Sequence, residues 1–555
     1  MKFLTDMNSR STCSVRRIAL ALLLVFKVST AQAEDTFAGI VSSATPEATA
    51  AGVGILERGG NAIDAAIAVS LALGATEPAG SGLFGQTVML VRLAPNTDPF
   101  VIHGTTYSPG TLPSDVERGQ LTRGHTASTI PSTLRVLDFA KRNYGSSAVT
   151  WADVLAPAIH YASEGFVVGP FRHRAFRNEM SELAEQKAAR ELFVRSDGIP
   201  YQIGDVFKNP KLATTLRRVA ADGALDFYRG KIAAEIVADM ESNSGWITAE
   251  DLSRMPEPEI VPALHSSYRG HDIYTLPPPF GGWVVLQILN ILEKSPVSAV
   301  DADDDSRRLA LLDAMSIAHN TRRYDPVPGF HDYAMDIATK ISREEAQHLL
   351  DAYMQDNGGE TTHFSIVDAD GMVVSATQSI DSYFGSHVAH PTLGFLYNNY
   401  MQSFRLEDDG SPYVLAPWQM PLSSMSATIL SRNGQTELVL GSPGSARIIS
   451  AVAQVTNHWV DIGAGVEAAV NAYRVHAVPD KLAYVEGDSI SSTLLLGLAK
   501  RGFALRRPAY GVSDSQLDPY FGGVHALARQ NDVWTGAADP RRDGAVGIAY
   551  RDKND

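Results

Sequence analysis

The sequence predicts an α+β fold, in which helical segments and antiparallel strand pairs alternate along the chain. Two loops indicate hairpins: residues 368–372 form a three-residue loop with Gly371 in the left-handed position, and Asn433-Gly434 separates two β-rich runs. The composition, 45% hydrophobic and 20% charged, is typical of a globular chain. A length of 555 residues is compatible with three or four domains or with one large layered domain.

Helix start and stop signals order the N-terminal half. Thr45-Pro46 combines an N-cap with proline at the first helical position, and that helix is expected to close at Gly59-Gly60. Asn61 caps the next helix, which is expected to run to Leu73. A loop over 80–85 follows and leads into a strand, without the lysine and spacing of a phosphate-binding loop. A mostly helical stretch from 132 to about 347 is expected to contain helices at 151–164, 209–222, 231–241 and 282–292.

The first 33 residues have the pattern of a secretory signal peptide. Arg16-Arg17 precedes an apolar run over 18–26, and Ala31-Gln32-Ala33 has the A-x-A form of a cleavage site. The mature chain is therefore expected to begin at Glu34, in the periplasm or outside the cell. The apolar run is shorter than the roughly 20 residues of a membrane helix, so no stable membrane span is expected. A retained amphipathic anchor is the alternative.

Charge and cysteine content exclude several classes of function. The formal net charge is −15, and an acidic surface repels phosphates, so nucleic-acid binding is disfavoured. The single cysteine, Cys13, lies in the signal segment, which leaves no disulfide and no cysteine nucleophile in the mature chain. His387 and His390 have no third histidine at ligand spacing, so no metal site is assigned.

A candidate nucleophile lies at Thr361. The polar run 355–360 ends abruptly in a β-branched and aromatic segment, which puts Thr361 at the first position of a strand. If the bond between Glu360 and Thr361 were cut, Thr361 would carry a hydroxyl and an α-amine, whose pKa of about 7.7 to 8.0 suits a general base. The alternative is an ordinary strand start.

The hairpin loop fixes the expected neighbours of Thr361. With residue 368 opposite residue 372, Thr361 faces Ser379 on the next strand. Residues two apart share a face, so Asp381 is expected on the same polar surface. A slip of one residue would turn Ser379 away.

A second segment resembles an anion-stabilising turn. Gly441 to Ser445 directly follows a predicted strand and precedes a helix that is expected to begin near Arg447. Backbone amides at a helix N-terminus stabilise the negative charge that develops during acyl transfer. Gly444 and Ser445 are therefore candidates for an oxyanion hole, and an ordinary strand-to-helix turn is the alternative.

These segments belong to a longer set of motifs that resembles the γ-glutamyltransferase (glutathione hydrolase) family of N-terminal nucleophile enzymes. The motifs are Gly59-Gly60-Asn61-Ala62-Ile63-Asp64-Ala65-Ala66, Pro277-Pro278-Pro279 with Gly281-Gly282, Thr361-Thr362-His363-Phe364-Ser365, Pro421-Leu422-Ser423-Ser424-Met425-Ser426, Gly441-Ser442-Pro443-Gly444-Ser445-Ala446-Arg447 and Asp539-Pro540-Arg541-Arg542-Asp543-Gly544. They span nearly the whole mature chain.

The resemblance implies a four-layer αββα sandwich, cleaved by itself into a large subunit over 34–360 and a small catalytic subunit over 361–555 that pair in one folded unit. Thr361 would attack an amide carbonyl, and water or an amine acceptor would release the acyl group. No cofactor is implied.

The substrate-binding residues depart from the family pattern. In the family, an arginine and two serines hold the substrate α-carboxylate; the serines are present as Ser423 and Ser424, but Thr105 stands at the arginine position. The substrate ammonium would meet Asp381, Tyr400 and Ser403, which also differ from the family residues.

Weak activity on γ-glutamyl donors is therefore expected, with partial improvement in Thr105→Arg. Two alternatives to a γ-glutamyl amidohydrolase stay open. One is an acylase of the same fold for a different amide, for example like a cephalosporin acylase. The other is a non-catalytic exported binding protein.

Overall fold

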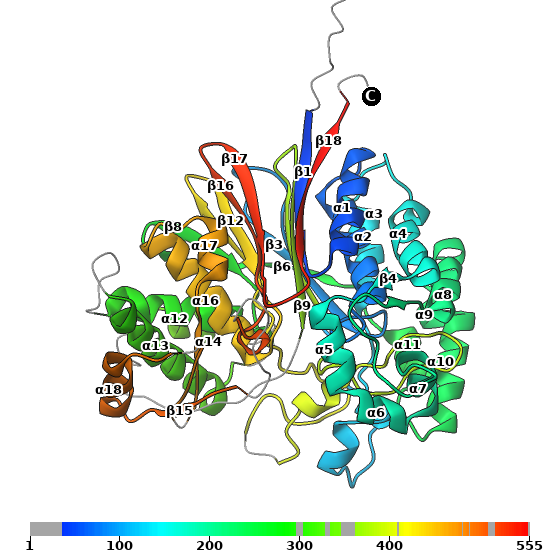
Figure 1. Cartoon of the computed structure of the whole chain (residues 1–555). Coiled ribbons are helices and arrows are strands. Elements are labelled where there is room, and N and C mark those ends of the chain that lie inside the picture. Colours follow the sequence, from blue (N-terminus) through cyan, green and yellow to red (C-terminus); the bar gives the residue numbers. More distant parts are fainter. Residues whose placement is uncertain are drawn as a thin grey trace, which may run out of the picture.

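Two stacked β-sheets lie between two helical layers (Figure 1). The computed structural model describes residues 36–295, 303–327, 334–343, 345, 361–407, 410–479, 481–487, 489–508 and 517–552. The arrangement of layers confirms the expected αββα sandwich.

The two large sheets are built from antiparallel neighbours. The seven-stranded sheet has the order β18 (Ala545–Arg551), β1 (Thr36–Ser43), β9 (Thr362–Asp368), β10 (Val373–Ser379), β2 (Gln86–Arg92), β3 (Phe100–His103) and β6 (Glu259–Pro262). The six-stranded sheet has the order β17 (Val533–Ala538), β16 (His525–Gln530), β12 (Gln435–Gly441), β11 (Thr428–Arg432), β8 (His271–Thr275) and β7 (Leu264–Tyr268). Two small sheets contain β13 (Val475–Val478), β14 (Leu482–Val485) and β15 (Ala504–Arg506), and β4 (Phe166–Val167) with β5 (Val206–Phe207).

Helices from different parts of the chain cover the two outer faces (Figure 1). Beside the seven-stranded sheet lie α1 (Pro46–Glu57), α2 (Ala62–Thr76), α3 (Thr133–Tyr144), α4 (Trp151–Glu164) and α8 (Pro210–Asp222). Beside the six-stranded sheet lie α12 (Gly282–Lys294), α13 (Asp304–Tyr324), α16 (Ala446–Asp461), α17 (Val466–Asn471) and α18 (Ser492–Lys500). The remaining helices are α5 (Pro170–Asn178), α6 (Met180–Glu185), α7 (Lys187–Phe193), α9 (Asp226–Arg229), α10 (Lys231–Ser242), α11 (Ala249–Arg254) and α14 (Ala334–Lys340).

Successive residues of the central strands fill two different core layers. Val367 of β9 packs between the two sheets, whereas its neighbour Ile366 packs toward the helices beside the seven-stranded sheet. Ile429 and Leu430 of β11 divide in the same way between the inter-sheet layer and the opposite helical layer. Because strand side chains alternate between faces, neighbouring residues of a central strand contribute to the two different layers. Side chains of β9 and β10 therefore pack on both faces of the seven-stranded sheet, which fixes this hairpin in the middle of the sandwich.

Local signals predicted several boundaries correctly. Thr45 caps α1 and Asn61 caps α2, although α2 continues to Thr76 rather than ending at Leu73. Asn433 and Gly434 have φ values of 50° and 74°, as the two-residue hairpin turn between β11 and β12 requires.

Strands β6, β7 and β8 were not predicted. They lie within the stretch expected to be mostly helical, and they are short strands of four or five residues. Both β6 and β7 are edge strands, whose mixed polar and apolar residues carry a weak periodic signal.

Some expectations fall outside the described residues: the signal peptide over 1–33, the start at Glu34 and the segment that ends at Glu360. In the part of the chain that the structure describes, no helix has both the length and the apolar character needed to cross a bilayer.

Four histidines are buried in the sandwich in their neutral form. His319, His363, His476 and His525 are at most 1% exposed. Burial lowers the pKa of His319 and His525 to about 3, and it holds the pKa values of His363 and His476 well below 6.5. In the unfolded chain all four take up a proton near pH 6.5.

The free energy of unfolding should therefore fall as the pH is lowered from 7.5 to 5.5, because only the unfolded state binds these protons. Each histidine contributes a loss of about 1.4 kcal/mol over this range. Asp381, with a pKa raised to about 7 by burial, opposes the trend, so a net loss of about 3 kcal/mol is expected in urea-unfolding measurements. His525→Gln should reduce the pH dependence, whereas the exposed His265→Gln should not. A pH-independent unfolding free energy would contradict the expectation.

Candidate active site

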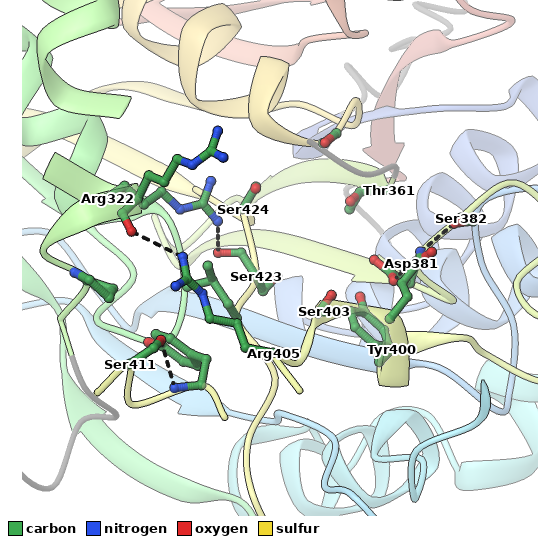
Figure 2. Close-up of a pocket in the computed structure, with 16 residues that line it drawn as sticks. Arg322, Thr361, Asp381, Ser382, Tyr400, Ser403, Arg405, Ser411, Ser423 and Ser424 are labelled. Atoms are coloured by element: carbon green, nitrogen blue, oxygen red, sulfur yellow. Dashed lines mark hydrogen bonds between the residues drawn. The ribbon is translucent and has the colours of Figure 1, made fainter. Parts of the chain in front are cut away.

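Thr361 lies immediately before β9 and lines a cavity of about 490 Å³ (Figure 2). It shares the wall with residues from several other parts of the chain. The lining residues are Arg322, Arg323, Pro326, Thr361, Asp381, Ser382, Tyr400, Gln402, Ser403, Arg405, Ser411, Tyr413, Leu422, Ser423, Ser424 and Ser445. Most of the residues predicted for the site are thus brought together around Thr361.

The predicted hairpin register is confirmed. Thr362 pairs with Gln378, so the next position places Thr361 opposite Ser379. Ser379 itself is 1% exposed and stands behind the cavity wall rather than in it. Its hydroxyl accepts a hydrogen bond of 2.7 Å from the backbone N–H of Asp381. The structure therefore connects Ser379 to the cavity through the turn that carries Asp381.

Asp381 is held in an unusual environment for a carboxylate. Its φ of 79° lies in the left-handed region, which non-glycine residues adopt rarely and often at functional sites. Burial raises the pKa of Asp381 to about 7, and a hydrogen bond of 2.7 Å from the Gln402 side chain opposes this shift only in part. At neutral pH the carboxyl group is thus divided between its neutral and charged forms.

Tyr400 and Ser403 belong to a short 3₁₀ helix, Tyr400–Ser403, on the same side of the cavity as Asp381 (Figure 2). Burial, with the nearby charge of Asp381, holds the pKa of the Tyr400 hydroxyl well above 10. Tyr400 therefore stays protonated and offers a neutral hydrogen-bond donor to the site.

The turn between β12 and α16 has the features expected of an anion-stabilising site. Gly444 and Ser445 have φ values of 119° and 67°, and α16 begins at Ala446. Neither backbone N–H donates a hydrogen bond to another described residue. The buried hydroxyl of Ser445 has no hydrogen-bond partner among the described residues either. Ser445 lines the cavity, whereas Gly444, the preceding residue, does not. Two amides and one hydroxyl are thus available beside Thr361.

Ser423 and Ser424 line the cavity together with three arginines that the sequence analysis did not identify. Arg322, in the last turn of α13, donates a hydrogen bond of 3.0 Å to the backbone carbonyl of Ser423. Arg405 donates a bond of 3.3 Å to the carbonyl of Arg323. No local pattern marks these arginines, because Arg322 and Arg323 come from α13, Arg405 follows the 3₁₀ helix, and only the tertiary structure brings the two segments to one cavity.

Thr105 is not part of this cavity. It is 2% exposed and lines a separate small pocket with His103, Tyr107 and Arg135. The arginines that line the cavity instead come from positions 322, 323 and 405. An arginine at position 105 would enter the separate pocket, so the proposed benefit of Thr105→Arg has no structural support.

Glu77 is a further residue that the sequence analysis missed. It is 1% exposed at the end of α2, and its carboxylate accepts a hydrogen bond from the hydroxyl of Thr362. This bond fixes the residue that directly follows Thr361. A single glutamate before a proline carries no sequence signal for that role.

A four-layer αββα sandwich with a threonine at the start of a central strand, facing a cavity beside a helix N-terminus, defines an N-terminal nucleophile hydrolase. The family model described as Gamma-glutamyltranspeptidase matches residues 48–549, and the chain belongs to that family.

A glutathione hydrolase and an acylase resemble the chain over nearly its full length. It is 31% identical to the glutathione hydrolase proenzyme of Escherichia coli (strain K12), over 95% of this chain and 97% of that one. It is also 31% identical to the acylase ACY 1 proenzyme of Pseudomonas sp. (strain V22), over 91% and 92%. The crystal structure of cephalosporin acylase from Bacillus halodurans superposes with a TM-score of 0.82 at 26% identity, covering 98% and 99%.

Proposed function

We propose that the protein is an autoprocessed N-terminal threonine amidohydrolase or acyltransferase that cleaves γ-glutamyl-type or related acyl amides. The observation that carries this proposal is the position of Thr361, which lines the same cavity as Ser445 at the start of α16. The names of the relatives support both γ-glutamyl and other acyl donors.

The reaction follows from the arrangement of donors and acceptors. Cleavage between Glu360 and Thr361 gives Thr361 a free α-amine, which takes the hydroxyl proton as the oxygen attacks the amide carbonyl. The backbone amides of Gly444 and Ser445 stabilise the oxyanion. The leaving amine departs with a proton, and water or an acceptor amine then attacks the acyl-enzyme.

The same scheme assigns the regions of the precursor. Residues 1–33 serve as a signal peptide that exports the chain to the periplasm or the medium. Residues 34–360 and 361–555 become the large and small subunits, which stay paired because β1 of the large subunit pairs with both β9 and β18 of the small subunit in one sheet. No metal or organic cofactor enters the proposed steps.

An acylase for a different amide is the second candidate. Asp381, Tyr400 and Ser403 line the cavity where the family has other residues, and the arginines approach from α13 and from position 405. These differences change what surrounds the acyl group while leaving Thr361 and Ser445 in place.

Donor profiling of the purified wild-type protein tests the proposal. A denaturing gel should show two bands that together account for the precursor, with an N-terminal threonine on the smaller one. A panel of acyl p-nitroanilides should then identify at least one donor that is cleaved with an acyl-enzyme burst. A protein that stays whole and cleaves none of the panel would instead support the non-catalytic binding protein.

A further inference from the structure

A row of three polar residues crosses the centre of the seven-stranded sheet at the cavity. Thr361 stands opposite Ser379 in the hairpin of β9 and β10, and Ser379 is paired in turn with Gln86, the first residue of β2. Cross-strand partners share one face of a sheet. Gln86 therefore lies on the same face as the nucleophile, two strands away from it, although it does not line the cavity.

The start of β2 is held tightly against Ser379. Gly85 precedes Gln86, and a Cβ atom at Gly85 would lie 2.3 Å from the carbonyl oxygen of Ser379. Only glycine allows two backbone segments to approach so closely. The carbonyl of Gly85 also accepts the backbone N–H groups of Ser132 and Thr133, at 2.9 and 3.2 Å, where α3 begins. The backbone thus fixes the place from which the Gln86 side chain extends.

The side chain of Gln86 connects three other segments of the chain. Gln86 is 0% exposed; its Oε1 accepts the backbone N–H of Thr106 at 3.3 Å, and its Nε2 donates to the hydroxyl of Ser423 at 3.4 Å. The third contact is a hydrogen bond with the hydroxyl of Tyr400. Because a buried polar group whose hydrogen bonds are made is held rigidly, the amide keeps one orientation.

Tyr400 carries this contact to the residue opposite the nucleophile. Its hydroxyl is hydrogen-bonded to the side chain of Ser379 as well as to that of Gln86. Tyr400 is 2% exposed and lies beside Asp381, below Thr361 in Figure 2. The hydroxyl of Ser379 also accepts the backbone N–H of Asp381 at 2.7 Å. Ser379 is therefore held from two sides, by the turn at Asp381 and by the Tyr400 hydroxyl that Gln86 contacts.

We propose, on the basis of the function proposed above, that Gln86 is a positioning residue for Thr361. Its amide holds the Tyr400 hydroxyl against Ser379, which keeps Ser379 in place opposite the nucleophile. Tyr400 then belongs to the support of Thr361 and is not a ligand of the substrate ammonium. The support matters because a displacement of about 1 Å at a reacting group can cost about 10² in rate.

Gln86→Met and Tyr400→Phe test the proposal. Methionine keeps the unbranched shape of the side chain without the amide, and phenylalanine keeps the ring without the hydroxyl. Mature wild type and both variants are assayed with a donor that the acyl p-nitroanilide panel identifies. Each variant should lower kcat about 10- to 100-fold with KM nearly unchanged, because neither removes a contact to the substrate. A raised KM with unchanged kcat in Tyr400→Phe would make Tyr400 a substrate ligand and overturn the proposal.

The double variant Gln86→Met/Tyr400→Phe shows whether the two residues act as one unit. Residues that act through a shared contact have strongly non-additive effects. The kcat of the double variant should therefore be close to that of the slower single variant. If the two losses multiply instead, Gln86 does not act through Tyr400, and the proposal is wrong.

Thr87→Val is the matched control for the loss of a buried hydrogen bond. Thr87 follows Gln86 on β2 and is equally buried, but its side chain lies on the opposite face of the sheet, where the hydroxyl donates to the Thr133 hydroxyl at 3.1 Å. This variant should lower the thermal midpoint and leave kcat close to wild type. Equal losses of kcat in Thr87→Val and Gln86→Met would assign the effect to general destabilisation and overturn the positioning role.

Thermal midpoints of the same four proteins, wild type, the two single variants and the double variant, give a readout that does not depend on turnover. If Gln86 and Tyr400 are bonded, the double variant should lower the midpoint by no more than the larger single loss. Additive losses would overturn the contact even if amides are cleaved. A wild-type chain that stays whole and cleaves no amide would instead refute the proposed function and the positioning role with it, while non-additive midpoints would leave the contact between Gln86 and Tyr400 standing.

Discussion

Thr361→Ala is expected to leave the precursor as a single band on a denaturing gel and to abolish amide cleavage. The variant lacks the hydroxyl that attacks the preceding carbonyl during maturation and the substrate carbonyl during turnover. Removing the nucleophile of a covalent mechanism typically lowers kcat by about 10⁴ or more. Thr361 lines the cavity and is 5% exposed, so the loss of a methyl group and a hydroxyl there should leave the sandwich folded.

Thr361→Ser is the matched control, because it keeps the hydroxyl and, after cleavage, the α-amine. It should mature to two bands, more slowly than wild type, and retain measurable turnover. A Thr361→Ala protein that matures or keeps wild-type activity would show that the nucleophile lies elsewhere.

Ser379→Ala is expected to slow both maturation and turnover by about 10² or more. Ser379 stands opposite Thr361 in the hairpin, and its hydroxyl accepts the backbone N–H of Asp381 at 2.7 Å. Without that acceptor, the left-handed turn at Asp381 loses a buried hydrogen bond, and the cavity wall beside the nucleophile is free to shift. Loss of one positioned hydrogen bond at a site of charge development typically costs about 10² to 10³ in rate.

Ser375→Ala separates this effect from simple destabilisation. Ser375 is four residues away on β10 and is equally buried, but its hydroxyl donates to the carbonyl of Leu440 at 3.1 Å, away from the cavity. Both variants should lower the thermal midpoint by similar amounts, and only Ser379→Ala should reduce the single-turnover rate. Equal single-turnover rates in the two variants would show that Ser379 does not position Thr361.

The pairing of donors and acceptors within short segments explains why much of the candidate site was predictable. The loop over 368–372 sets the register of β9 and β10, since a three-residue connection with Gly371 at φ 81° allows one pairing. That register places Thr361 opposite Ser379. The helix start at Ala446 likewise follows from the turn before it.

Contacts between distant segments were not predictable in the same way. No pattern in the sequence indicates that β1 lies between β9 and β18, or that β6 extends the sheet beyond β3. Sheet order depends on which apolar faces pack against each other, and strands buried on both faces have no distinctive pattern that selects a neighbour.

The sequence by itself predicted the candidate nucleophile and the candidate oxyanion turn, and it determined the strand register that places Thr361 opposite Ser379, because hydrogen-bond geometry over a few residues decides that register. Only the tertiary structure decided the composition of the cavity. Arg322 and Arg405 reach it from segments more than 80 residues apart, and Arg322 does so through a bond to the Ser423 carbonyl. Thr105 stands at the arginine position of the family pattern, but it lines a different pocket. Charge in a cavity is the sum of side chains from all the elements that enclose it, and only their docking assembles that sum.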